Sequence, residues 1–171
     1  MKVFKINLWD FIGKVDALCI TTNGFIKRGG KAVMGRGCAF EASKKFIGID
    51  EILGYKIEHE GNVPHILWEN PLIVSFPVKP ESKICIDVKQ DVVKHMVSKF
   101  KVGDFIPGWA CKANLDIIEN SAKLLSLMAN SANWKRVVLP TVGTGYGEMG
   151  WEIIEPILDQ YLDDRFFCVS F

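Results

Sequence analysis

The 171-residue sequence has no long uncharged stretch, no excess of one charge and no closely spaced pair of cysteines. No uncharged run approaches the roughly 20 residues that a membrane-spanning helix needs, so we expect no membrane association. The formal net charge of +1 argues against broad binding to a phosphate backbone, and any anion should be recognised locally. We therefore expect a nucleic acid to bind only if it is a modified substrate. The sequence does not indicate the oligomeric state.

Cysteine and histidine are both sparse. None of the five cysteines forms a Cys-x-x-Cys pair: Cys19, Cys38, Cys85, Cys111 and Cys168. An odd, scattered set favours reduced, buried thiols in a cytoplasmic protein over disulfides or zinc. No metal-ligand spacing relates these cysteines to the three histidines, His59, His65 and His95. We therefore expect no metal and no cofactor, and we assign the histidines no function.

Strand-like and helix-like stretches alternate along the chain. Apolar or alternating runs predict five strands, at residues 2–8, 16–22, 72–76, 137–139 and 166–171. Apolar residues at helical spacing predict four helices, at residues 37–46, 88–100, 115–128 and 151–162. Pro77 is expected to close the third strand, so that Lys79 lies in a proline-flanked loop. This alternation predicts a layered α/β domain with a largely parallel sheet.

Two glycine-rich turns each lie between a strand and a helix: Met34-Gly35-Arg36-Gly37-Cys38-Ala39 and Val142-Gly143-Thr144-Gly145-Tyr146-Gly147. Glycine lets a backbone approach a ligand closely, and a helix that begins there directs free N–H groups at the turn. In a parallel sheet both turns lie at the carboxyl ends of the strands, with Asn23 and the segment after Phe76. Together they indicate a clamp on a diphosphate. Neither turn fits a P-loop or a complete Rossmann fingerprint.

On three segments the sequence resembles the macro domain, the ADP-ribose-binding module. These segments are residues 16–24, in which a strand ends at Asn23, and the two glycine turns, the second followed by Trp151-Glu152. The first turn and Phe76-Pro77-Val78-Lys79 look closest to the branch with terminal ADP-ribose glycohydrolases and DarG-type antitoxin macro domains. The resemblance implies a single macro domain over residues 1–171, a three-layer α/β/α sandwich with a mixed, largely parallel central sheet.

The resemblance also implies roles for single residues. Asn23 would hydrogen-bond the distal ribose of ADP-ribose and belong to the catalytic set. The two turns would hold the diphosphate through Gly35, Arg36, Gly37 and Cys38, and through Gly143, Thr144, Gly145, Tyr146 and Gly147. Lys79 matches a lysine that acts at the anomeric carbon C1″. Its amine could attack C1″ or stabilise developing charge if its pKa is lowered or a neighbour takes its proton.

Two departures from the family pattern leave alternatives open. Many members have an aspartate that accepts from the adenine amino group; the simplest alignment places Asn7 there, and a shifted one places Asp10. Some glycohydrolases have a catalytic aspartate where this chain has Gly147, with Glu148 one residue later. Glu148 is either a substitute general acid or base or an exposed carboxylate at a helix start.

The implied activity is hydrolysis at C1″ that removes ADP-ribose from a modified macromolecule. Two alternatives use the same pocket: an ADP-ribose 1″-phosphate phosphatase and a non-catalytic ADP-ribose reader. Tyr146, between glycines, is expected over the ligand, whereas Trp151 opens an apolar helical stripe and is expected in the core. The turn Pro107-Gly108-Trp109 either brings an aromatic ring over a sugar or base or anchors a surface loop.

Overall fold

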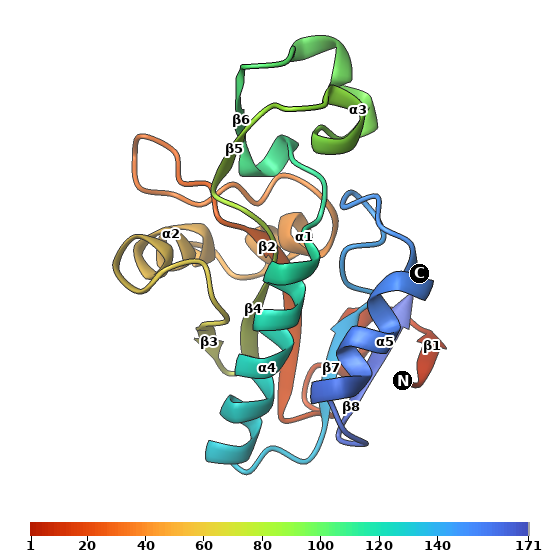
Figure 1. Cartoon of the computed structure of the whole chain (residues 1–171). Coiled ribbons are helices and arrows are strands. Elements are labelled where there is room, and N and C mark those ends of the chain that lie inside the picture. Colours follow the sequence, from red (N-terminus) through yellow and green to blue (C-terminus); the bar gives the residue numbers. More distant parts are fainter. Residues whose placement is uncertain (171) are drawn as a thin grey trace.

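A computed structural model describes residues 1–170, and six of its strands form one sheet in the order β1-β8-β7-β2-β4-β3 (Figure 1). The strands are β1 (Val3–Lys5), β2 (Ala17–Asn23), β3 (Ile66–Glu69), β4 (Leu72–Lys79), β7 (Val137–Pro140) and β8 (Phe166–Ser170). Every neighbouring pair is parallel except the antiparallel β3–β4 pair. The mixed, largely parallel sheet expected from the sequence is confirmed.

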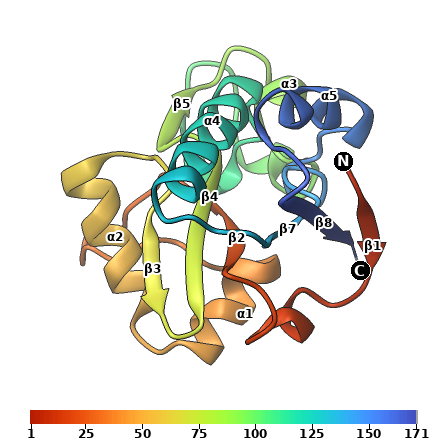
Figure 2. The ribbon, with the colours of Figure 1, turned by 90° about the horizontal axis from the view of Figure 1, so that it is seen from below.

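Helices cover both faces of this sheet, as Figure 2 shows. Helices α4 (Leu115–Ser131) and α5 (Trp151–Tyr161) pack on one face. The other face carries α1 (Gly37–Lys45), α2 (Ile49–Glu60) and the 3₁₀ helix η1 (Leu8–Phe11). Alternate residues of a buried strand therefore enter different cores, with Cys19 in the first and Leu18 and Ile20 in the second. The three-layer α/β/α arrangement is confirmed.

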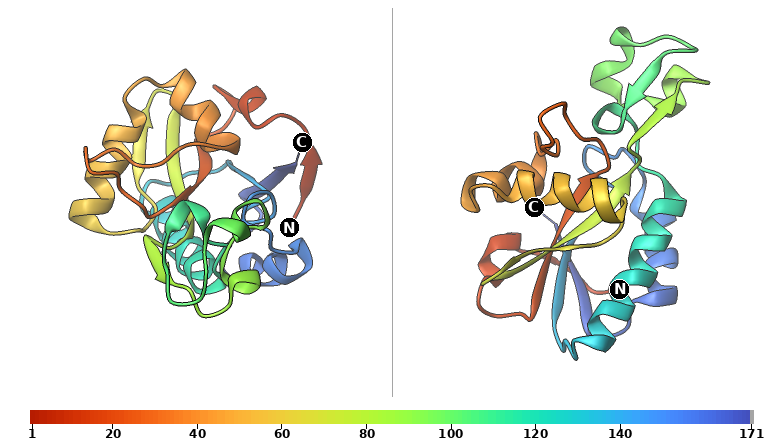
Figure 3. Two further views of the ribbon diagram at one scale, coloured as in Figure 1. Left: turned by 90° about the horizontal axis from the view of Figure 1, so that it is seen from above. Right: turned by 90° about the vertical axis from the view of Figure 1, so that its left-hand side faces the viewer.

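Residues 80–112 form a segment that projects beyond the layers at the carboxyl end of β4 (Figure 3). It contains β5 (Ser82–Ile84), β6 (Phe105–Pro107), the short helix α3 (Val88–Asp91), and the 3₁₀ helices η2 (Lys94–Lys99) and η3 (Gly108–Ala110). A separate apolar cluster holds it together: Cys85, Val92, Ile106, Ala110 and Cys111. This 80–112 segment thus has a small core of its own.

The expected end of the third strand at Pro77 is wrong, because β4 continues to Lys79. Pro77 pairs with Thr22 of β2, whereas β3 pairs with β4 only as far as Val74. Beyond Val74 the strand has one neighbour, and a residue without an N–H is tolerated at such an edge. Lys79 is consequently a strand residue and not a loop residue.

The continuous helix expected over residues 88–100 is also wrong. Val92 has extended backbone angles (φ −105°, ψ 137°) and forms an isolated β-bridge with Cys111, so α3 and η2 are separate. The first strand is shorter than expected, since Asn7 caps η1. All five cysteines are free and buried, as the sequence predicts. Within residues 1–170, no helix combines the length and hydropathy needed to cross a membrane.

Candidate functional site

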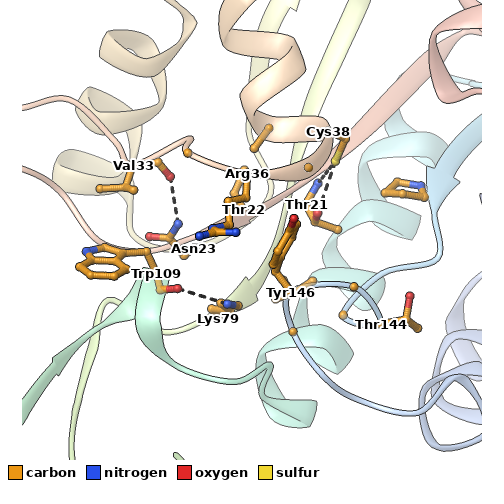
Figure 4. Close-up of a pocket in the computed structure, with 18 of the residues that line it drawn as sticks. Thr21, Thr22, Asn23, Val33, Arg36, Cys38, Lys79, Trp109, Thr144 and Tyr146 are labelled. Atoms are coloured by element: carbon orange, nitrogen blue, oxygen red, sulfur yellow. Dashed lines mark hydrogen bonds between the residues drawn. The ribbon is translucent and has the colours of Figure 1, made fainter. Parts of the chain in front are cut away.

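A cavity of about 410 Å³ lies at the carboxyl ends of β2, β4 and β7 (Figure 4). It is lined by the ends of β2 and β4, residues 33–39, residues 140–147, Val169 of β8 and the 80–112 segment. Its volume falls within the range of about 300–1,000 Å³ that is usual for small-molecule sites. The two glycine turns and Asn23 converge on this cavity, as the sequence predicts.

The first glycine turn lines the cavity with Gly35, Arg36, Gly37 and Cys38. Helix α1 begins at Gly37, whose φ of +57° lies in the left-handed region that favours glycine. Arg36 caps this helix without a side-chain hydrogen bond, so the first N–H groups of α1 remain available to a ligand. Burial raises the pKa of the Cys38 thiol, which therefore stays neutral, and its Sγ lies 3.4 Å from Thr21 Oγ1.

The second glycine turn lines the opposite wall and is tightly folded. Gly143 has a φ of +73°, and its carbonyl oxygen accepts the Met149 N–H at 3.1 Å. A Cβ on Gly147 would lie 2.3 Å from that same oxygen, so only glycine fits there. Thr144 Oγ1 donates to Thr141 O at 2.8 Å. The turn therefore presents its backbone to the cavity in one fixed conformation.

Asn23 lies at the end of β2 with its side-chain amide already partly engaged. Its Nδ2 donates to Val33 O at 3.0 Å, and its Oδ1 accepts the Phe25 N–H at 3.0 Å. An amide has two N–H groups and two acceptor lone pairs, so one of each remains for a ligand. Asn23 can thus fix the 24–33 loop and bind a ligand hydroxyl at the same time.

Lys79 is the last residue of β4, paired in register with Asn23, and it is 7% exposed. Its Nζ donates to the Trp109 carbonyl oxygen at 3.3 Å (Figure 4). Burial, with a smaller contribution from Arg36, lowers the pKa of Lys79 from 10.5 to about 8. Roughly one amine in ten is then neutral at pH 7, whereas an ordinary lysine is almost wholly charged.

Aromatic side chains line part of the cavity. The Arg36 guanidinium carbon lies 4.9 Å from the Tyr146 ring centroid, which joins the two glycine turns by a cation–π contact. The His95 ring meets Tyr146 edge-on at 6.3 Å, and Trp109 also lines the cavity. Nothing in the spacing of the histidines distinguished His95, which the sequence analysis left without a role. For Trp109, the first of the two alternatives, an aromatic at the pocket, agrees with its position.

No protein-family model matches the sequence, and no curated protein matches it significantly. The macrodomain of Thermus aquaticus DarG matches the structure with a TM-score of 0.67 and 18% identity, over 99% of this chain and 96% of that one. The macrodomain of Mycobacterium tuberculosis DarG matches with a TM-score of 0.68 and 17% identity, over 99% and 95%. The chain has a macrodomain fold.

A third solved structure, Thermosipho africanus DarTG in complex with ADP-ribose, aligns with 98% of this chain and 40% of that one. Its TM-score is 0.66 and its identity is 16%. The fold that the sequence resemblance implied is thus confirmed.

Three of the residues singled out from the sequence do not line the cavity: Asn7, Asp10 and Glu148. Asn7 Oδ1 accepts the Trp9 N–H at 2.9 Å as the cap of η1. The cavity lining does not distinguish Asn7 from Asp10 as the residue that would contact adenine.

Glu148 precedes α5 by three residues and connects two segments instead. Its Oε1 accepts the Lys94 N–H at 2.7 Å, and its Oε2 lies 3.6 Å from Lys112 Nζ. Its φ of +55° is unusual for a residue with a side chain. Among residues 1–170 no aspartate or glutamate lines the cavity, and Lys79 is the lining residue whose pKa is lowered toward neutrality. Trp151 packs partly buried against the α4–α5 core, consistent with its expected place.

Proposed function

We propose that this macrodomain binds ADP-ribose in the cavity and hydrolyses the bond at C1″ of the distal ribose, releasing ADP-ribose from a modified macromolecule. The observation that carries the proposal is the buried Lys79 amine, which lies beside Asn23 in a cavity walled by two glycine turns and has a pKa of about 8. A structure with this fold that contains ADP-ribose supports the choice of ligand.

Binding follows from the donors that face the cavity. The free N–H groups at the start of α1 and the backbone of residues 143–147 would hold the diphosphate, since a helix N-terminus favours an anion. The free N–H and lone pair of Asn23 would bind hydroxyls of the distal ribose. Asn7 and Asp10 remain the two alternatives for the adenine amino group.

The chemistry requires one group with a pKa near neutrality. As the bond from C1″ to the leaving group breaks, positive charge develops on the ribose, and the nearby diphosphate stabilises it. By one route the neutral Lys79 amine attacks C1″ as the leaving group departs, and water then hydrolyses the new N–C1″ bond and releases the amine. By the other route the amine takes a proton from a water molecule that attacks C1″ directly. In both routes the products gain the elements of water: a hydroxyl on C1″ and a proton on the leaving group.

Calorimetric titration with ADP-ribose, ADP and NAD tests the binding step. We expect micromolar ADP-ribose affinity and much weaker ADP affinity, because ADP lacks the ribose that Asn23 would hold. Release of ADP-ribose from a panel of ADP-ribosylated proteins and oligonucleotides then tests hydrolysis. No heat with ADP-ribose would contradict the whole proposal.

A non-catalytic reader is the second candidate, because no carboxylate lines the cavity within the described residues. Binding without release from any member of the panel would favour the reader. Phosphate release from ADP-ribose 1″-phosphate would instead identify the phosphatase.

A further inference from the structure

The 80–112 segment begins directly after Lys79 and returns to the same place. Gly108 N donates to Glu81 O at 2.8 Å, which fixes the returning chain against the strand end. The next residue, Trp109, supplies the carbonyl oxygen that accepts from Lys79 Nζ. The surroundings of the amine are therefore set by a turn that lies 30 residues further along the chain.

Only glycine permits this return. A Cβ on Gly108 would lie 1.8 Å from Pro80 O and 2.9 Å from Glu81 O, both of them backbone atoms that cannot rotate away. Within the turn, Cys111 N donates to Gly108 O at 3.1 Å, and from outside it Val93 N donates to Ala110 O at 3.0 Å. The position of the Trp109 carbonyl is thus fixed by backbone contacts.

Lys79 does not have the surroundings of a lysine kept for stability. It forms no salt bridge with any described residue, although a buried charge without a partner is costly. A single carbonyl acceptor orients the amine without neutralising its charge. A chain that needed only a stable strand end would gain from an apolar residue here.

We propose that the Gly108–Ala110 turn positions the Lys79 amine for the reaction at C1″ and shields it from water. The part that concerns the reaction rests on the proposed function, whereas the part that concerns titration of the amine does not. Two effects act together: the Trp109 carbonyl directs Nζ, and the turn excludes the water that would solvate the ammonium form. Gly108 is therefore a positioning residue that acts through Lys79.

Gly108→Ala tests this, with the Lys79 titration followed by NMR of ¹³C-labelled lysine in the whole chain. The added methyl group must push the turn away from Pro80, so water should reach the amine and its pKa should rise by about one unit or more. Release of ADP-ribose at pH 7.5 should fall at least about fivefold, and the pH–rate profile should shift with the titration. ADP-ribose affinity should stay within about threefold.

Two matched controls separate position from general damage. Gly29→Ala adds the same methyl group at a glycine with no atom within 4 Å and no left-handed φ, and it should change neither the pKa nor the rate. Trp109→Phe keeps the carbonyl and a flat ring, and it should leave the Lys79 pKa unchanged.

A second modification covers the case in which Gly108→Ala does not fold. Replacing Ala110 by lactic acid makes the Trp109 carbonyl an ester, a weaker acceptor of the same shape. The ammonium form then loses stabilisation, and the Lys79 pKa should fall, opposite in sign to the glycine variant.

An unchanged Lys79 pKa in both altered proteins would overturn the proposal, as would a loss of turnover without any change in titration. Absence of ADP-ribose binding by the wild-type chain would contradict the proposed function alone, because the NMR titration needs no substrate.

Discussion

The two sides of the cavity differ in how they are supported. The sheet side consists of Asn23 and the two glycine turns. These turns connect strands to α1 and α5, which pack in the two large cores. The other side is the 80–112 segment, which has a core of five buried residues and contributes His95, Met96 and Trp109. Lys79 lies at the junction, on a sheet strand but held by the segment.

This difference suggests a division of work within the proposed function. Backbone donors need a rigid support to keep their geometry, and the strand–helix connections provide it. The segment instead controls the surroundings of one amine, where a small displacement changes protonation more than it changes affinity. Substitutions on the sheet side should therefore alter ADP-ribose affinity, and those that act through the segment should alter turnover.

Removal of the Lys79 amine should give the largest effect. Lys79→Ala should reduce ADP-ribose release by at least about a hundredfold, because no other described residue lining the cavity combines burial with a lowered pKa. ADP-ribose affinity should remain within a few-fold. Release rates and calorimetry measure the two quantities, and a lost affinity would make Lys79 a binding residue.

The pH dependence of turnover should follow Lys79. Its folded pKa of about 8 lies below the ordinary 10.5, so the neutral fraction rises tenfold per unit below pH 8 and levels off above it. Release should increase about 25-fold between pH 6.5 and 8.5. A rate that falls across this range would show that the ammonium form acts instead.

The same shift predicts a change in stability. Between pH 8 and 10.5 the unfolded chain binds more protons at Lys79 than the folded chain, so this group's contribution to the free energy of unfolding rises with pH. Below pH 8 the folded protein holds a buried ammonium at a cost. Lys79→Met should therefore raise the free energy of unfolding at pH 7 by up to about 3 kcal/mol, measured by urea denaturation.

The sheet side is tested at one glycine of the second turn. Gly147→Ala should weaken ADP-ribose binding by about tenfold, because its Cβ would lie 2.3 Å from Gly143 O and displace the turn's N–H groups. Gly29→Ala is the matched control, because a Cβ there meets nothing within 4 Å and Gly29 does not line the cavity. Equal affinities in the two variants would show that the turn does not hold the ligand.

The sheet side is also the part that the sequence predicted. Glycines at strand–helix junctions fix local geometry, and parallel strands bring such junctions to one edge, so Asn23 and both turns could be placed without coordinates. Helix α2 went unrecognised partly because Gly54 interrupts its pattern. That glycine is required for contact, since a Cβ there would lie 1.9 Å from Gly30 O.

The segment side could not be predicted because its contacts are distant in sequence. Val88, Val92 and Val97 have helical spacing, but they pack on a cluster that includes Cys85 and Ile106, which no local pattern reveals. Lys79 between two prolines indicates a loop, yet pairing with β2 extends the strand through it. The solvation of a lysine depends on such tertiary contacts, so its pKa could not be anticipated.

A buried carboxylate tests the segment as a unit. Asp91 is 6% exposed, and its Oδ2 accepts the N–H groups of Ile86 and Asp87 at 2.8 and 2.9 Å, while Lys83 binds Oδ1. Burial raises the pKa of Asp91, but these hydrogen bonds outweigh it and hold the pKa below its ordinary value. Stability from this group is thus present at neutral pH and is lost as the pH falls through the folded pKa.

Asp91→Asn should lower the local stability of the 80–112 segment by about 1–3 kcal/mol, because an amide N–H₂ would replace one acceptor oxygen. Hydrogen exchange of the segment's amides measures this loss, and turnover should fall severalfold with ADP-ribose affinity within about twofold. Asp87→Asn, at an exposed cap, is the control. A matching loss of affinity would contradict the division between the two sides.

Substitution of Glu148 should change turnover least, and it distinguishes a structural role from a role as general acid or base. Glu148 links the two sides directly, because it follows the second turn and accepts from Lys94 in the segment. A glutamine keeps that acceptor and loses only the charge near Lys112. Glu148→Gln should therefore leave release within about twofold, whereas replacement of a general acid or base would cost at least about a hundredfold. Glu148→Ala removes the acceptor as well, and a loss of turnover confined to that variant would assign Glu148 to joining the two sides, not to proton transfer at the substrate.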